Sequence, residues 1–153
     1  MFFERKWYAY AQTLLESDDF KDLNLRTTAG LGVGYQFFDT DRTKLFVEAG
    51  PSYVNEDFDE AEDNDYAAAR WSTGFEFDIV PKLIKFYHLG EGYYSLEDSE
   101  SCFVLTEQGL PFTLVERLFL NFEFDCDYNN KPAPGKEKSD SAYIIGLGYD
   151  FDF

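Results

Sequence analysis

The stretch Tyr143-Ile-Ile-Gly-Leu-Gly-Tyr-Asp-Phe-Asp-Phe153 decides how this sequence is interpreted. The residues at odd positions from 143 to 153 are all apolar, whereas those between them are mostly small or acidic. A repeat of two residues is typical of a β-strand whose two faces lie in different surroundings. We therefore predict an amphipathic strand over residues 141–153.

Similar alternation recurs along the whole chain. Segment 23–38 shows it most clearly, with Leu25 and Val33 on one face and Arg26 on the other. No segment keeps a period of 3.6 residues, so we expect almost no helix. Pro111 should mark an irregularity, because proline cannot donate a ladder hydrogen bond. The other predicted strands are 5–15, 23–38, 43–54, 66–79, 82–95, 101–114 and 118–128, with the least clean alternation in 82–95 and 101–114.

Length and composition limit the possible classes of protein. The 153 residues fit a single domain. A net charge of -17 argues against nucleic acid as a partner, because phosphates would be repelled. The chain has no run of 18 apolar residues and therefore no predicted transmembrane helix. Its mean hydropathy of -0.40 still allows a membrane barrel, because half of the residues in a barrel strand are polar.

The connections between the predicted strands alternate in length. Short turns are predicted at 39–42, 80–81 and 115–117, and longer, charged segments lie near 16–22, 55–65, 96–100 and 129–140. Outer-membrane barrels have short periplasmic turns and longer outer loops. We therefore expect residues 1–153 to form an all-β, eight-stranded, antiparallel, up-and-down transmembrane β-barrel in a bacterial outer membrane, with acidic extracellular loops.

The charged faces of the strands are rich in glycine, which suits a narrow lumen. Eight strands leave an interior that side chains can fill, so a network of ion pairs is favoured over a pore for small ions. A soluble, ligand-binding barrel of the lipocalin type is a further alternative, with the apolar face turned inward. The predicted lumen charges are Arg26, Lys44, Glu48, Arg70, Glu76, Glu107, Glu123 and Asp125.

Three other features could carry function. The segment 55–65 has seven acidic residues and could bind calcium or bridge to lipopolysaccharide, but it lacks the order of an EF-hand and could be a solvated loop. His88 has no nucleophile motif beside it, so we expect a structural role, no catalysis, no cofactor and no metal site. Cys102 and Cys126 lie on neighbouring predicted strands. They could form a disulfide or remain two free thiols.

Closure of the barrel depends on the first and last strands. Trp7, Tyr8 and Tyr10 could pair with residues 143–151 and give a monomer, whereas unpaired edges would require another chain. The expected partners are the lipid bilayer, lipopolysaccharide and the outer-membrane insertion machinery. No secretory signal peptide is visible, so we expect a mature or trimmed chain.

Several blocks of sequence are similar to those of one bacterial family. They include Leu23-Asn-Leu-Arg-Thr-Thr-Ala-Gly-Leu-Gly-Val-Gly-Tyr-Gln-Phe37, Tyr66-Ala-Ala-Ala-Arg-Trp71, Thr106-Glu-Gln-Gly-Leu110, Pro132-Ala-Pro-Gly-Lys-Glu-Lys138 and Gly146-Leu-Gly-Tyr149. From about Lys6 to Phe153 the chain resembles the salt-induced outer-membrane proteins, a domain of unknown function.

This resemblance implies an outer-membrane barrel without established catalytic residues. The function expected from it is a structural or protective role in the envelope. Tyr149, Phe151 and Phe153 resemble the C-terminal insertion signal of such barrels. Members of the family are usually longer, with further strands before Trp7. Pro111 and the two cysteines are also unusual for the family. A trimmed, recombined or engineered member would explain these departures.

Overall fold

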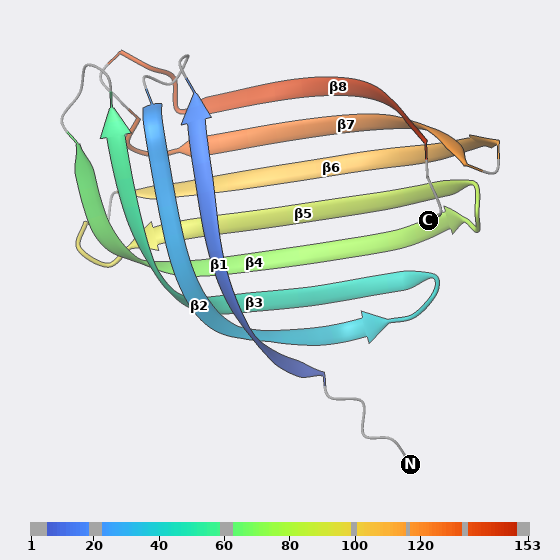
Figure 1. Ribbon diagram of the computed structural model, residues 1–153, viewed down its shortest axis with the longest axis horizontal. Helices are drawn as coiled ribbons and strands as arrows, with labels where there is room; N and C mark the ends of the chain where they lie inside the picture. Colours follow the sequence, from blue (N-terminus) through green and yellow to red (C-terminus); the bar gives the residue numbers. More distant parts are fainter. Residues whose placement is uncertain are drawn as a thin grey trace.

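The computed structural model describes residues 6–18, 23–58, 63–98, 101–115, 117–132 and 135–149. Within these ranges, all the strands belong to one antiparallel sheet in the order β1-β2-β3-β4-β5-β6-β7-β8 (Figure 1). Their bounds are β1 Trp7–Asp18, β2 Leu23–Asp39, β3 Thr43–Phe58, β4 Asn64–Val80, β5 Ile84–Ser95, β6 Cys102–Val115, β7 Leu118–Asn129 and β8 Ser139–Tyr149. The described chain contains no helix long and apolar enough to cross a membrane. The predicted all-β, up-and-down fold of eight strands is confirmed.

Several strands run further than the alternation predicted. Glu16 and Glu56, which were assigned to charged loops, lie in β1 and β3 and both pair with Arg26 in the ladder. The charge pairing explains the extension, because each carboxylate faces the arginine on the same side of the sheet. Part of the acidic segment 55–65 is therefore strand, and its residues 59–62 lie outside the described residues.

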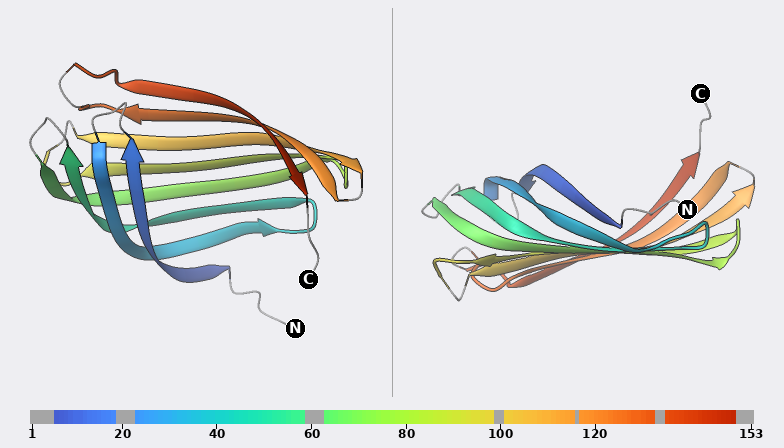
Figure 2. Two further views of the ribbon diagram at one scale, coloured as in Figure 1. Left: turned by 45° about the horizontal axis from the view of Figure 1, so that its top comes forward. Right: turned by 90° about the horizontal axis from the view of Figure 1, so that it is seen from below.

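The sheet is strongly bent, and β1 to β4 curve over one of its faces (Figure 2). We call this side the concave face. Gln12 of β1 donates a hydrogen bond of 2.9 Å to Glu91 of β5. The guanidinium of Arg26 in β2 lies 4.2 Å from the ring centroid of Phe103 in β6. Strands four apart are opposite one another in a closed barrel of eight strands, so the local curvature is that of a small barrel.

The edges of the sheet are not joined. Among the described residues, β1 pairs with β2 alone and β8 pairs with β7 alone. The predicted pairing of Trp7, Tyr8 and Tyr10 with residues 143–151 is therefore not formed as far as Tyr149, and residues 150 and 151 lie outside the described residues. Tyr8 and Tyr10 instead cover glycines of β2 on the concave face. Both edge strands keep unpaired backbone groups, which another strand could satisfy.

The two faces differ in polarity as the alternation predicted. On the outer face, Leu31 and Ile145 are 63% and 71% exposed, whereas Arg26 on the concave face is 4% exposed. The register also resolves the ambiguous strand β5, because Arg70 pairs with Tyr93 and thereby puts Tyr93 and Glu91 on the concave face. Pairing between β5 and β6 is interrupted around Pro111, where the irregularity was expected.

Glycines in the strands make room for aromatic rings. Tyr8 lies across Gly34 of the neighbouring strand so closely that a Cβ on the glycine would overlap the ring. The other ring-over-glycine pairs are Tyr10–Gly32, Phe46–Gly74, Trp71–Gly92, Tyr87–Gly109 and Phe119–Gly148, each between residues opposite in the ladder. In all of them the ring belongs to the earlier strand. Close packing of ring on backbone explains why glycine is frequent in these strands.

This packing predicts a difference between two glycine substitutions. Gly34→Ala should lower the free energy of unfolding by about 1–3 kcal/mol, because the Tyr8 ring must move away. Gly146→Ala should change it by less than about 0.5 kcal/mol, because nothing lies within 4 Å of the added carbon. Urea unfolding followed by tryptophan fluorescence would measure both, and equal effects would contradict the packing argument.

Candidate functional site

Two groups of polar side chains on the concave face differ in character. We call the set around Arg70 the arginine network; it contains Glu48, Glu91, Tyr8, Gln12 and Tyr93. We call the second set the acidic wall; it consists of Glu107, Glu123, Asp125, Asp127 and Asp140 on β6, β7 and β8. The register places all eight predicted lumen charges on this face, but it divides them between different clusters.

Arg70 holds the arginine network together. Its Nη1 donates to Glu48 at 2.9 Å, and its Nε and Nη2 donate to the two oxygens of Glu91 at 3.0 and 3.2 Å. The Arg70 side chain is only 3% exposed. A buried guanidinium needs this pairing, because an unpaired charge away from water is costly.

Side chains from β1 complete the network. The Tyr8 hydroxyl donates to Glu48 at 3.0 Å. The amide of Gln12 donates to Glu91 and to the Tyr93 hydroxyl, each at 2.9 Å. These hydrogen bonds connect β1, β3, β4 and β5 through side chains in addition to the ladder.

Arg26 forms a second ion-paired centre at the end of the sheet near the longer connections. Its Nη1 lies 2.9 Å from Glu16, and its Nε donates to Glu56 at 2.8 Å. The guanidinium rests on Phe103, whose ring stacks on Tyr93 with centroids 4.5 Å apart. Arg26 is thus neutralised by carboxylates and supported by a buried aromatic pair.

The remaining predicted cation, Lys44, is in a different environment. It lies 3.8 Å from Glu76, with both side chains about half exposed near the short turns. Lys85 approaches the same carboxylate at 3.3 Å. Ion pairs this exposed contribute little to stability because water screens them.

The acidic wall has no arginine or lysine of its own. Glu107 and Asp125 are directly opposite in the ladder between β6 and β7. Within the described ranges neither carboxylate forms an ion pair, and one oxygen of Asp125 is buried without a hydrogen-bond partner. Glu123 accepts hydrogen bonds from Tyr87 at 2.5 Å and from Asn121 at 2.9 Å. Like charges directly opposite in a sheet are destabilising.

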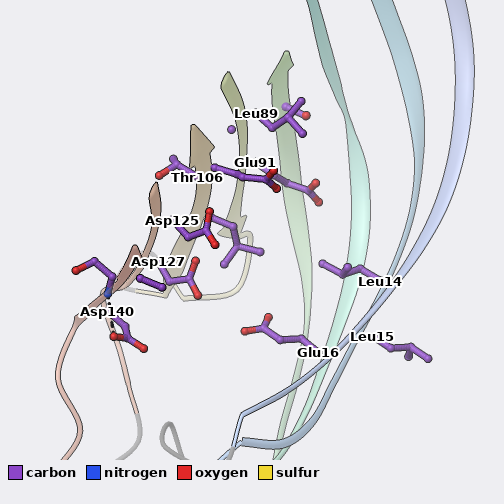
Figure 3. Close-up of a pocket in the computed structure, with 15 residues that line it drawn as sticks. Leu14, Leu15, Glu16, Leu89, Glu91, Thr106, Asp125, Asp127 and Asp140 are labelled. Carbon is purple, nitrogen blue, oxygen red and sulfur yellow. Dashed lines mark hydrogen bonds between the residues drawn. The ribbon is translucent and has the colours of Figure 1, made fainter. Parts of the chain in front are cut away.

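A cavity of about 600 Å³ separates the acidic wall from β1. Figure 3 shows Glu91, Asp125 and Asp127 on one side of this space and Leu14 and Glu16 of β1 on the other. Residues 140–142 of β8 also line the cavity, so it occupies the gap between the two edge strands. None of the described lining residues is lysine or arginine.

The other predicted candidates lie outside these clusters. His88 is on the outer face of β5, opposite Phe75. Cys102 and Cys126 are free thiols. Because Cys126 pairs with Thr106, four residues along β6 from Cys102, the two are about 13 Å apart in the ladder, too far for a disulfide.

Two further predictions concern acidic and terminal segments. Among the described residues no group of three or more His, Cys, Asp or Glu could hold a metal ion, and residues 59–62 of the acidic segment are not described. Tyr149 ends β8 on the outer face, half exposed, whereas Phe151 and Phe153 lie outside the described residues.

Sequence reasoning missed two of the ion-paired carboxylates on the concave face. Glu91 was not selected because its strand carries Tyr87, Leu89 and Tyr93 on the same face, which hides the polar alternation. Glu16 was assigned to a loop, although it continues the even-numbered series of Tyr8, Tyr10 and Gln12. Extending this even-numbered series as far as residue 16 would have assigned Glu16 to the same face.

The arginine network predicts a contrast between two substitutions. Arg70→Met should lower the free energy of unfolding by about 3–5 kcal/mol, because Glu48 and Glu91 would remain half-buried without a cation. The matched variant Lys44→Met should cost less than about 1 kcal/mol, because its ion pair is exposed. Urea unfolding would compare them, and a similar loss in both variants would contradict the assigned role of Arg70.

Comparison with known proteins gives one match. No curated protein and no solved structure matches this chain. A family model described as a protein of unknown function, DUF481, matches residues 1–151. The chain therefore belongs to the DUF481 family.

Proposed function

We propose that this protein is an outer-membrane β-barrel with a structural or protective role in the bacterial envelope and a polar lumen filled by side chains. It performs no catalysis in this proposal. The observation that carries the proposal is the distribution of side chains between the two faces of the sheet. Apolar residues face outward and ion-paired residues face inward, which is the reverse of a soluble sandwich.

The outer face supports a lipid environment. Large apolar side chains are exposed there on the first and second strands and on the last, among them Trp7, Leu31, Val33, Tyr143, Ile145 and Leu147. An apolar surface of this extent is unusual for a soluble monomer and drives association in water. In a bilayer these side chains contact hydrocarbon instead of water, so the cost of exposing them is removed. The hydrogen-bonded ladder satisfies the backbone groups between neighbouring strands.

The concave face supports a filled lumen in preference to an open pore. Hydrogen bonds from Gln12 and contacts of Tyr10 with Arg70 reach across this face between strands that are not neighbours. Side chains that meet across the interior narrow any water path between β1 and β5 at that level. The tight curvature of the sheet also narrows the interior.

An envelope role also agrees with the resemblance to salt-induced outer-membrane proteins. In this proposal the acidic outer connections contact lipopolysaccharide, bridged by divalent cations. The insertion machinery would recognise Tyr149, Phe151 and Phe153. Closure in the bilayer would require β1 and β8 to pair with each other or with further strands.

Folding of urea-unfolded protein would test the membrane assignment. We expect a β-type circular dichroism spectrum and heat-modifiable gel migration when detergent micelles or lipid vesicles are present, and neither in plain buffer. Val33→Lys should reduce the folded yield in vesicles, because a charge facing lipid costs about 2–4 kcal/mol near the bilayer midplane.

Thr40→Lys is the matched control, because Thr40 is exposed in a short turn and the substitution adds the same charge as Val33→Lys. It removes only two exposed hydrogen bonds, between the Thr40 hydroxyl and the backbone of Thr43. It should fold in vesicles like the parent chain. A monodisperse β protein in plain buffer, in which Val33→Lys is as well tolerated as Thr40→Lys, would contradict the membrane proposal.

Conductance would test the filled lumen. Planar bilayers containing the folded protein should show no stable channel steps, because the arginine network crosses the interior. Arg70→Met removes the central cation and should raise the frequency of transient openings. Stable, cation-selective steps in the parent protein would favour the alternative of a pore for small ions.

A further inference from the structure

We infer that the outer rim of the sheet, at the end that carries the short turns, binds the headgroups of anionic phospholipids. We call this surface the cationic rim; it consists of Lys6, Arg42 and Lys82 with the aromatic side chains beside them. The inference rests on the proposed membrane location. It adds to that proposal a preferred class of lipid and the end of the sheet that meets it.

The two ends of the sheet differ in charge among the described residues. The connections from β2 to β3 and from β4 to β5 lie at one end (Figure 1). The described residues of this end include the cations Lys6, Arg42, Lys44, Lys82, Lys85 and Arg117 and the acids Asp39, Asp41, Glu76 and Asp78. The opposite end carries the acidic connections, where the described lysines are Lys131, Lys136 and Lys138. Cations are therefore concentrated at the end with the short turns.

The acids of this end lie beside the mouth of the concave face. All four line a cavity of about 490 Å³, together with Arg42, Lys44 and Lys85. Within it Glu76 pairs with both lysines, at 3.8 and 3.3 Å. Neutralisation of charge is thus arranged toward the lumen, and the outward side of the same end keeps cations beside apolar residues.

Two cations of the rim lie beside aromatic rings. The guanidinium of Arg42 lies 5.2 Å from the ring centroid of Phe77, which is on the outer face of β4. The ammonium of Lys6 lies 3.4 Å from the carbonyl oxygen of Phe37. The Phe37 ring packs edge-on against Tyr35, with centroids 4.8 Å apart. Aromatic rings at headgroup level, with lysine or arginine reaching the phosphates, are the arrangement expected at a bilayer interface.

Lys82 occupies a turn position that suits lysine poorly. The β4–β5 turn is closed by a hydrogen bond of 3.0 Å from the backbone N–H of Leu83 to the carbonyl of Val80. Pro81 precedes Lys82, and Lys82 has a φ of 65°. This is the pattern of a type II turn, whose third residue is usually glycine or asparagine. A lysine kept in this conformation indicates a use for its side chain.

A layer of lipid headgroups fits the rim better than a small soluble anion does. The three cations come from separate segments: the residue before β1, the β2–β3 turn and the β4–β5 turn. Exposed apolar side chains accompany them, such as Trp7 beside Lys6 and Leu83 beside Lys82. A row of cations bordered by apolar residues matches a leaflet, in which each phosphate is attached to acyl chains.

Tryptophan quenching would test the rim in vesicles that contain equal amounts of phosphatidylglycerol and phosphatidylcholine. In each sample one of the two lipids carries bromine on its acyl chains, so the lipid composition is otherwise the same. Trp7 is the reporter, because it is 66% exposed and packs on Tyr35, and Trp71→Phe removes the other indole. Brominated phosphatidylglycerol should quench Trp7 about two- to fivefold more efficiently, the enrichment expected from one exposed cation.

A pair of double variants would locate the lipid preference. Lys6→Gln with Arg42→Gln should make the two lipids quench almost equally. The matched control, Lys44→Gln with Lys85→Gln, removes the same charge from the same end, but on the side of the concave face, and should keep the preference. Both double variants should fold, because all four side chains are exposed.

Lys82→Asn separates the charge of the rim from the stability of the turn. Asparagine adopts a positive φ more readily, so the urea midpoint in neutral micelles should rise. The preference for phosphatidylglycerol should nevertheless fall at an indole introduced by Phe86→Trp, with both native tryptophans replaced by phenylalanine. Phe86 is suitable because it lies opposite Phe77 on the outer face. An unchanged lipid preference in this variant would contradict the inference.

The outcomes separate the lipid preference from the membrane proposal. Equal quenching by the two lipids in the parent chain, or an equal loss of preference in the Lys44/Lys85 control, would overturn the cationic rim and leave the membrane location intact. Absence of quenching by either lipid would contradict the membrane location and the inference that rests on it.

Discussion

The buried guanidinium of Arg70 is the interaction on which the rest of the concave face depends. Its hydrogen bonds to Glu48 and Glu91 fix the relative positions of β3, β4 and β5, and Gln12 extends the connection to β1. Such a pair contributes less through attraction than through the penalty for any arrangement that separates it. Flattening the sheet would move Gln12 away from Glu91 and expose the arginine network, so the network favours the curved form over a flat one.

Glycines allow the curvature that the charges require. Each ring-over-glycine pair lets an aromatic side chain of one strand lie on the backbone of the next, as Tyr8 does on Gly34 and Phe46 does on Gly74. A methyl group at either glycine would push the strands apart on the side where they must converge. The charged residues and the glycines on the concave face therefore act together to favour the curved sheet.

The alternation of residues was sufficient to predict the eight strands, their antiparallel order and the direction of most side chains, because parity alone determines the face. It did not predict which carboxylate would meet Arg26, since Glu16 and Glu56 were both assigned to loops and not to strands. It also failed in β5, where aromatic residues share the polar face with Glu91. Closure was left open by the alternation, and in the structure Tyr8 and Tyr10 lie over glycines of β2 while β1 and β8 do not pair.

The two halves of the concave face differ in how their charges are balanced. Around Arg70 the guanidinium neutralises Glu48 and Glu91, so substitutions there would chiefly change stability. Beside β8, Glu107 of β6 faces Asp125 of β7, and a single lysine in the sequence would relieve this repulsion. Like charges that face each other across a sheet lower its stability, so the acidic wall holds its strands together less firmly than the arginine network does.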